Sequence, residues 1–539
     1  MHRNVVVAGL GLPALLLCGV APAQTTITIK ATANQHPISP LIYGAAFPSA
    51  FQVGDLNLPI SRYGGNEASS YNWELDCQAK GNDWYYESWA SDNNSYPGGS
   101  VDNFVANLKA GGAQPLLTVP MLTWLGKVGS NRSTLWSYSI AKYGAQTGND
   151  PWNGDAGNGI SSATGQPITS NDPNDANTPN SVATQQAWLN HLIGKWGNAA
   201  SGGIKYYVMD NEPSIWYSTH QDVHPVGESY DEIYSDYVNY AGALRAADPN
   251  AFICGPEEWG WDGYFYSGRD MQYGSAHGWS NLPDRAAHGN VPHIPWLLEQ
   301  LRKYQASTGT QLLNALTVHY YPQSGEDSND DSAGTQAVRN RSTRSLWDPS
   351  YTDVSWIDSI VELIPRLQSW VSTYYPGLQT GITEYNWGDE GEMNGATTQA
   401  DIYGIFGQQG LGMATRWTVP ASNTPTYKAM QMYRNYDGAG STFGDTSISA
   451  TVPNPDNLSA FAALRTSDGA MTIMVISKVL SGTTPVKLTL AHFAASGSAK
   501  VYRLTASNVI QKLTALTWSG GVLNDTEPAQ SITLYVLPK

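Results

Sequence analysis

Residues 206–213 read Tyr-Tyr-Val-Met-Asp-Asn-Glu-Pro, a short β-prone run that ends in a carboxylate between an amide and a proline. Proline disfavours a helical conformation of the residue before it, so Glu212 is expected to be extended, and the missing N–H of Pro213 ends the strand. Barrels and open α/β sheets hold their chemistry at the carboxyl ends of strands. The stretch therefore predicts a strand that delivers an acid, and the alternative is an acidic turn without function.

Seven further β-prone segments accompany this strand. They lie at 41–44, 59–63, 115–119, 251–254, 315–319, 381–384 and 414–417, and segments with helical spacing of apolar residues separate them. Eight strands alternating with helices predict a (β/α)8 TIM-like barrel over residues 38–435, with long loops. A doubly wound sheet is the alternative.

The pattern changes after the barrel. Residues 436–539 contain short strands broken by glycine, proline and Asp-Gly turns, without a helical period, which predicts a C-terminal β-sandwich domain. The N-terminal strand within residues 24–37 precedes the barrel and would otherwise be an unpaired edge, so we expect it to join the sandwich.

Composition and charge restrict the class of ligand. Only 14% of residues are charged, the net charge is −16, and no Lys/Arg cluster is present, which argues against nucleic-acid binding. The chain has 19 Trp and 31 Tyr but only 9 Phe. Tryptophan and tyrosine combine an apolar face with a polar tip, which suits half-wet surfaces that bind sugars.

The N-terminus predicts export. Residues 1–23 have the pattern of a secretory signal peptide with cleavage near Ala23, so we expect a secreted protein, extracellular or periplasmic. No later apolar run reaches the length of a membrane span, and we expect neither a membrane partner nor an oligomer, but a monomer. Cys77 and Cys254 remain after cleavage, and the sequence allows either a disulfide or two buried thiols.

Two glutamates close two of the predicted strands. Hydrolysis of a glycosidic bond with retention requires two carboxylates roughly 5 Å apart, one protonated and one ionised. Glu212 closes the fourth strand and Glu384 the seventh, so the two are far apart in sequence and predicted to be adjacent in space. We assign Glu212 as the acid/base and Glu384 as the nucleophile. The alternative is two unrelated acids at the rim.

Several motifs together resemble one known family, glycoside hydrolase family 44, the endo-acting β-1,4-glucanases and xyloglucanases. The resemblance covers nearly the whole chain after residue 23 and rests on segments 62–66, 71–73, 82–87, 155–160, 209–213, 318–322 and 383–388. It implies a barrel and a β-sandwich that includes the first strand, a β-1,4-linked polysaccharide substrate, a retaining mechanism and the same two glutamate roles. Tyr63 replaces the tryptophan usual in the family and keeps an aromatic ring. A non-catalytic carbohydrate-binding barrel is the alternative.

Other residues near the strand ends are candidate substrate-binding groups. Arg62 is expected to orient the nucleophile, Asn211 to bind a sugar hydroxyl, and the segment from His319 through Tyr320 to Tyr321 to contact the nucleophile or the sugar. The candidates for stacking on glucosyl faces are Trp84, Trp216, Trp387 and Trp417, with Trp89 and Trp124 also following strands or lying in loops. The alternatives are a surface salt bridge for Arg62, a turn residue that caps its own backbone for Asn211, rim packing for residues 319–321 and core filling for the tryptophans.

Two other sets of acidic residues are candidates for a role, one in catalysis and one in metal binding. Glu257 and Glu258 are rivals of Glu384, and at most one of them can reach the site if the strand is extended. Members of the resembled family bind structural calcium, and the oxygen-rich segment 150–155 is expected to supply Asp150 and Asp155 as ligands. A loop without an ion is the alternative, and catalysis is expected to need no cofactor.

Overall fold

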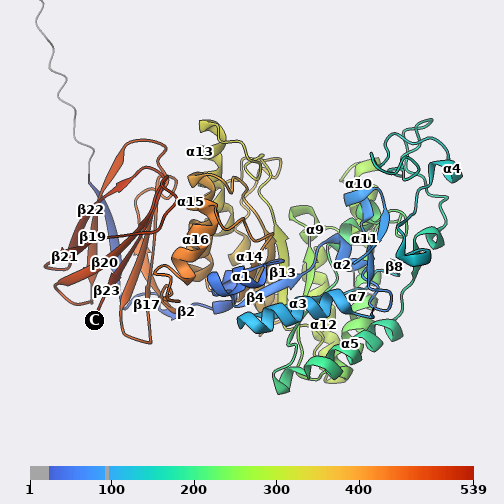
Figure 1. Cartoon of the computed structure of the whole chain (residues 1–539), viewed down its shortest axis with the longest axis horizontal. Coiled ribbons are helices and arrows are strands. Elements are labelled where there is room, and N and C mark those ends of the chain that lie inside the picture. The colour runs from blue at the N-terminus through green and yellow to red at the C-terminus, as the bar shows by residue number, and fades with distance from the viewer. Residues whose placement is uncertain (1–23, 92–95) are drawn as a thin grey trace, which may run out of the picture.

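The protein consists of an α/β barrel and a β-sandwich that pack side by side (Figure 1). The computed structural model describes residues 24–91 and 96–539. The predicted signal peptide at residues 1–23 therefore lies outside the described residues. The predicted boundary between residues 435 and 436 falls between the last barrel helix and the first C-terminal strand of the sandwich.

Eight parallel strands form the barrel. In spatial order they are β3 (Gly44–Ala45), β15 (Met413–Arg416), β14 (Gln379–Tyr385), β13 (Ala315–Tyr320), β12 (Phe252–Glu258), β11 (Tyr206–Met209), β7 (Gln114–Val119) and β4 (Ile60–Tyr63). The first two strands in the chain, β3 and β4, stand at the two ends of this order and also contact each other. The sheet is therefore nearly closed, which confirms the barrel and excludes the doubly wound alternative.

Helices connect successive barrel strands. They include α3 (Gly99–Gly111), α5 (Val182–Trp196), α7 (Tyr230–Asp236), α8 (Gly242–Ala247), α12 (His293–Thr308), α14 (Leu363–Tyr374) and α15 (Met393–Gln408), and α16 (Pro425–Arg434) follows the last barrel strand. Their ends follow ordinary capping rules. In α5, for example, the Ser181 side chain accepts from the N–H of Thr184, and Gly197 follows the last turn.

Long insertions cap the carboxyl ends of the strands. They include a small sheet of β5 (Cys77–Ala79), β6 (Glu87–Ala90) and β9 (Leu135–Trp136), a hairpin of β8 (Trp124–Gly126) and β10 (Asn177–Pro179), and short helices. The other α-helices of the described residues are α2 (Asn66–Ser69), α4 (Ile140–Tyr143), α6 (Trp216–Thr219), α9 (Trp261–Phe265), α10 (Gly268–His277), α11 (Pro283–Ala287) and α13 (Ala333–Ser342), with α1 (Ala50–Asp55) as the connection between β3 and β4.

The sandwich is one continuous sheet folded over a second core. Its order is β21 (Gln511–Trp518), β20 (Gly497–Leu504), β23 (Ser531–Leu537), β18 (Met471–Ser477), β17 (Leu458–Leu464), β16 (Thr446–Thr451), β1 (Thr25–Lys30), β19 (Thr483–Ala491) and β22 (Val522–Pro528), with β2 (His36–Pro37) beside β16. The N-terminal β1 is a central strand, antiparallel to β16 and parallel to β19.

Helix α15 joins the two parts. Its residues from Met393 to Gly407 are all buried, because one side contacts α16 and the other contacts strands of the sandwich. A helix buried all round belongs to the interior of a protein. The larger hydrophobic core accordingly continues from the barrel into the sandwich, where it includes Phe461, Met474 and Leu534.

The two cysteines are unpaired and buried. The thiol of Cys77 donates to the carbonyl of Gly126 at 3.3 Å, whereas Cys254 lies against the sulfur of Met413. Of the two alternatives left open by the sequence, the structure has the buried thiols. Among the described residues, no helix combines the length and the apolar character needed to cross a membrane.

Candidate active site

The predicted acid/base residue lies directly beyond β11 in an unusual backbone conformation. Glu212 has φ 47° and ψ 54°, and its N–H donates to the carbonyl of Glu257 at 3.1 Å. The expectation of an extended backbone was therefore wrong. Proline excludes the right-handed helical region for the preceding residue, and Glu212 adopts the left-handed region instead. Such a conformation is costly for a non-glycine residue and persists only where its surroundings enforce it.

The two predicted catalytic carboxylates are brought together. An oxygen of Glu212 and an oxygen of Glu384, the last residue but one of β14, lie within 4.8 Å of one another. His319 lies between them, with Nδ1 2.8 Å from Glu212 and 3.6 Å from Glu384. Both carboxylates are mostly enclosed, with 15% and 7% of the side chain exposed. The site is thus a close carboxylate pair at the open end of the barrel.

Two donors contact the carboxylate of Glu384. Arg62 donates from Nη1 to Oε1, and the hydroxyl of Tyr321 donates to Oε2 at 2.8 Å. Hydrogen bonds and an ion pair to a carboxylate favour its charged form and fix its orientation. Arg62 is fully buried, so it contacts the carboxylate and not the substrate.

Two glycines allow this packing. A Cβ added at Gly64 would overlap the guanidinium of Arg62, and one added at Gly65 would lie 2.6 Å from the ring of Trp417. Gly65 also has φ 87°, in the region that favours glycine. The Gly64-Gly65 pair after β4 is therefore required by the close approach of the backbone to two candidate site residues.

Glu212 is in an environment that favours its protonated form. Burial raises the pKa of Glu212 above its ordinary value of 4.5, and the charge of Glu384 raises it further, while His319 and Arg62 act in the opposite direction. A general acid at neutral pH needs such a raised pKa. The pair is thus differentiated by its surroundings, since only Glu384 is held directly by Arg62 and Tyr321.

His319 is a buried cation between carboxylates. Burial opposes its charge, but Glu384, Glu212 and Glu257 raise the pKa of His319 to about 9. Its Nε2 lies 3.1 Å from Glu257, so both ring nitrogens face carboxylate oxygens. Glu257 also accepts from Thr317 and Thr383 and lies 3.6 Å from Arg62. Glu257, weighed as a rival nucleophile, is fully buried and positions His319 instead.

Glu258 points to the other side of β12, into a second buried cluster. Its side chain accepts from Ser214 and lies 3.6 Å from His293, whose second nitrogen is 3.3 Å from Glu228. All three ionisable groups are fully buried. Glu258 therefore has no access to substrate.

Asn211 and Asp210 organise the turn before the acid. Asn211 accepts from Arg62 at 2.7 Å and donates to Asn66 at 3.2 Å. Asp210, also at positive φ, accepts from the backbone N–H groups of Met121, Leu122 and Asn211. Asp210 therefore braces the strand end against the loop after β7.

Three predicted sugar-contacting residues are buried away from the carboxylates. Trp216 is 1% exposed and donates to the carbonyl of Asn211, Trp387 is 3% exposed and donates to Ser342, and Tyr320 is 1% exposed and donates to Asp353. These three predictions were wrong, because the side chains fill space behind the site. Tyr321, one residue along, donates to Glu384 instead.

Other tryptophans do lie at the open end of the barrel. Trp417 is half-buried against Gly65. Trp84 follows Asp83, and Asp83 accepts from Asn66, which in turn accepts from Asn211. The ring of Trp84 stacks on the ring of Trp152, with centroids 5.4 Å apart. Trp152 is 81% exposed. Trp84 and Trp152 therefore form an aromatic platform. The sequence predicted Trp84 but not its partner Trp152, which lies in the loop after α4.

The predicted calcium segment supplies one good ligand and one poor one. Asp150 is 4% exposed and faces Glu87, which is 3% exposed, and both burial and Asp150 raise the pKa of Glu87. Two buried carboxylates in contact need a cation or a shared proton, and oxygen donors suit Ca²⁺. Asp155 is instead held by Trp136, Ser139 and the N–H of Ala141. Glu87 also accepts from Trp89 and Asn153. The carboxylate that faces Asp150 is therefore Glu87 and not Asp155.

Comparisons with known proteins agree on one family. The family "Glycoside hydrolase family 44" matches residues 77–324. Endoglucanase A of Paenibacillus lautus is 30% identical over 481 residues, covering 85% of this chain and 64% of that protein. A β-mannanase/endoglucanase A of Caldicellulosiruptor saccharolyticus is 29% identical over 514 residues, covering 88% and 36%. The chain thus spans less than two thirds of either of these relatives.

Solved structures resemble the chain over almost its whole length. CelM2, a bifunctional glucanase-xylanase from a metagenome library, is 56% identical with a TM-score of 0.94, covering 96% of this chain and 99% of that one. A Paenibacillus polymyxa xyloglucanase from glycoside hydrolase family 44 is 27% identical with a TM-score of 0.80, covering 96% and 100%.

Proposed function

Because the chain belongs to glycoside hydrolase family 44, we propose that it hydrolyses internal β-1,4 bonds of soluble or amorphous glucans, xyloglucan included, with retention of configuration. The observation that carries the proposal is the spacing of Glu212 and Glu384, whose oxygens lie within 4.8 Å. Retaining pairs are roughly 5–5.5 Å apart, whereas inverting pairs are about 6.5–9.5 Å apart to admit a water.

The reaction proceeds by double displacement. Glu384 attacks the anomeric carbon while Glu212 donates its proton to the leaving oxygen, which breaks the glycosidic bond and forms a glycosyl ester on Glu384. Glu212, now ionised, accepts a proton from water, and the hydroxide oxygen replaces Glu384 at the anomeric carbon. Arg62 and Tyr321 hold the nucleophile through both steps. His319 keeps a positive charge beside both carboxylates.

The test is hydrolysis of a polysaccharide panel. Wild-type protein is expected to release reducing ends from xyloglucan and carboxymethyl cellulose, and Glu384→Gln is expected to lose at least about 10³-fold in rate, since a nucleophile is removed. Glu299→Gln, on the outer face of α12, is the matched control and should retain full rate. Proton NMR of the first product should show the β-anomer. Equal rates for wild type and Glu384→Gln, or an α-anomer, contradict the proposal.

Hydrolysis of xylan is a second activity to be measured in the same panel. CelM2, 56% identical, is described as a glucanase-xylanase, and this likeness supports β-1,4-xylan as a further substrate. Hydrolysis of xylan that disappears with Glu384→Gln is the expected result. The alternative of a non-catalytic carbohydrate-binding protein predicts binding of the panel without release of reducing ends.

We also propose export and a structural cation. Residues 1–23 support secretion, and Edman or mass analysis of protein from the medium should give Gln24 as the first residue. Glu87 and Asp150 would hold Ca²⁺ and so neutralise a buried carboxylate pair. The ion would act on the stability of the cap and takes no part in the two displacements.

A further inference from the structure

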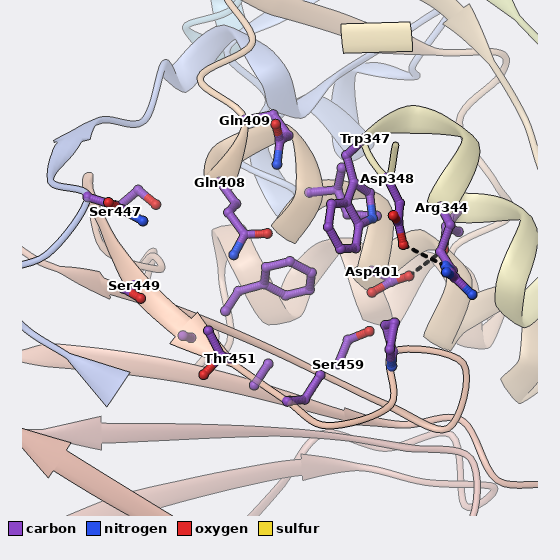
Figure 2. Close-up of a pocket in the computed structure, with 18 of the residues that line it drawn as sticks. Arg344, Trp347, Asp348, Asp401, Gln408, Gln409, Ser447, Ser449, Thr451 and Ser459 are labelled. Carbon is purple, nitrogen blue, oxygen red and sulfur yellow. Dashed lines mark hydrogen bonds and ion pairs between the residues drawn. The ribbon is translucent and has the colours of Figure 1, made fainter. Parts of the chain in front are cut away.

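A cavity lies where the barrel meets the sandwich. It has a volume of about 500 Å³, within the range of about 300–1,000 Å³ that is typical of small-molecule sites. The end of α15, the segment after α13, and strands β16 and β17 line it. Figure 2 shows Trp347 and Gln408 on one side, with Ser449, Thr451 and Ser459 on the strands across from them. The cavity therefore combines residues of both parts.

The cavity is remote from the carboxylate pair. Helix α15 begins at Met393, a few residues beyond Glu384, and runs 16 residues away to Gln408 at the cavity. At 1.5 Å per residue this helix spans about 24 Å. Successive α15 residues descend from the open end of the barrel toward its amino-terminal face, so the cavity is separate from the candidate active site.

The strands present hydroxyl groups where an interface would ordinarily be apolar. Along β16, Ile448 and Ala450 point into the sandwich core, so the alternating Ser447, Ser449 and Thr451 point toward the barrel. Apolar side chains normally cover such buried faces. Ser447 is buried, Ser449 is half-buried and Thr451 is exposed, so the row of hydroxyls runs from the interior of the cavity to its mouth and suits a polar occupant.

The polar groups of the cavity lack protein partners. Within the described part of the chain, the Nε1 of Trp347, the amide of Gln408 and the hydroxyls of Ser447, Ser449 and Ser459 make no hydrogen bond. Asp401, 1% exposed, has one carboxylate oxygen, Oδ1, without a partner. Buried polar groups are normally satisfied, so Asp401 Oδ1 is an exception. The other groups are open to the cavity and make no hydrogen bond within the described residues, so they are available to a ligand.

The charges of the cavity cancel. Arg344 pairs with Asp348 at 2.8 Å, and Lys478 pairs with Asp401 at 2.5 Å. Neither cation is left to attract an anion. The remaining polar groups are the half-buried indole of Trp347, the side-chain amides of Asn34, Gln408 and Gln409, the imidazole of His36 and several hydroxyls. Aromatic faces beside amides and hydroxyls are the chemistry that binds a neutral polyhydroxylated molecule through stacking and hydrogen bonds.

We propose that this cavity is a second carbohydrate-binding site, which holds a short neutral gluco-oligosaccharide away from the catalytic carboxylates. Trp347 and Phe461 form its apolar walls, and Gln408, Ser449 and Ser459 bind sugar hydroxyls. The site requires both the barrel and the sandwich. The proposal rests on the proposed function only for the choice of a glucosyl ligand.

The test is calorimetric titration of the full chain carrying Glu384→Gln with cellotriose. Two binding events are expected, one in the catalytic cleft and one in the cavity. Adding Trp347→Ala or Gln408→Ala should weaken the cavity event at least tenfold and leave the cleft event unchanged. Leu480→Ala, an exposed apolar side chain of the sandwich outside the cavity, is the matched control and should retain both events.

A substitution that fills the cavity gives a second test that does not remove a packed side chain. Ser449→Tyr adds bulk to the cavity without removing a core side chain, and it should abolish the second event while circular dichroism and the melting temperature stay unchanged. A single binding event in Glu384→Gln, or two events that survive all three substitutions, overturns the proposal. Polysaccharide hydrolysis by the wild type is scored separately, so hydrolysis with a single binding event rejects the cavity alone. Two events without hydrolysis reject the proposed activity alone.

Discussion

At the residue scale, His319 is the group that couples the two carboxylates, because its cation lies beside both. Its charge lowers the pKa of Glu212 against the raising effect of burial. Replacing His319 with Asn removes that charge, so the pKa of Glu212 should rise. The protonated form of Glu212, which acts as the general acid, is then present up to a higher pH.

We therefore expect the basic limb of kcat/KM on a neutral polysaccharide to move to higher pH in His319→Asn, with a lower maximum. The wild-type limb should itself lie above 4.5, the ordinary pKa of a glutamate, because burial raises the pKa of Glu212. The measurement is kcat/KM against pH for both proteins on xyloglucan. A limb that stays in place or moves to lower pH would show that His319 does not act through Glu212.

Side-chain direction explains which candidate residues the sequence placed well. Glu212 and Glu384 could be predicted because both end predicted strands, and the structure brings them together. The position in the chain alone did not show which of Tyr320 and Tyr321 contacts the carboxylates. The side chains of a strand alternate between its two faces, which places His319 and Tyr321 on one face and Tyr320 on the other. Irregular register between β13 and β14 at His319 further obscures the alternation.

At the element scale, the turn after β4 determines where Arg62 can lie. In Gly64→Ala the new methyl group would overlap the guanidinium, so Arg62 must shift away from Glu384. A displacement of about 1 Å at a catalytic group costs on the order of 10²-fold in rate. We expect a loss of about that size in kcat, measured on xyloglucan at saturating substrate.

Gly54→Ala is the matched control for this substitution. Gly54 lies in α1 with no heavy atom near its added Cβ, and alanine is favoured in a helix by about 0.5–1 kcal/mol. This variant should keep full activity with equal or higher stability. A Gly64→Ala protein with wild-type kcat would mean that the position of Arg62 tolerates the overlap.

The cap should respond to removal of a cation. Glu87 on β6 and Asp150 in the loop after α4 form the buried carboxylate pair, so a chelator is expected to lower the melting temperature by several degrees through loss of bound Ca²⁺. Glu87→Gln should have a lower melting temperature that EDTA no longer changes. Glu299→Gln, remote from the pair, should respond to EDTA like the wild type. Insensitivity of the wild type to EDTA contradicts the cation site.

At the scale of the whole molecule, one core crosses the boundary between barrel and sandwich. Phe461, Met474 and Leu534 belong to the same cluster as the barrel helices, and α15 is buried between the two parts. We therefore expect a single cooperative transition in scanning calorimetry of residues 24–539. The barrel segment 38–435 expressed alone should not fold, because it exposes the sandwich-facing side of α15. Two separate transitions, or a folded segment, would contradict this.

The sequence predicted the architecture best for the strands that are buried on both faces. Barrel strands are buried on both faces and bounded by turn residues, so they are recognisable in the sequence as short apolar runs. The sandwich is recognisable because its short strands are not separated by segments with helical spacing. The cap was not predicted as a unit. Strands such as Leu135–Trp136 and Asn177–Pro179 are too short to show a period, and contacts distant in sequence position them.

The central place of β1 in the sandwich has a consequence for how the chain is made. Its partners β16 and β19 are synthesised about 400 residues later, a delay of roughly 20–80 s at translation rates of about 5–20 residues per second. During that interval the first strand has no neighbour, while the barrel can already assemble. The nascent protein must keep an apolar β segment from pairing elsewhere until its last hundred residues emerge, so holdase chaperones should matter more to its yield than to that of a barrel alone.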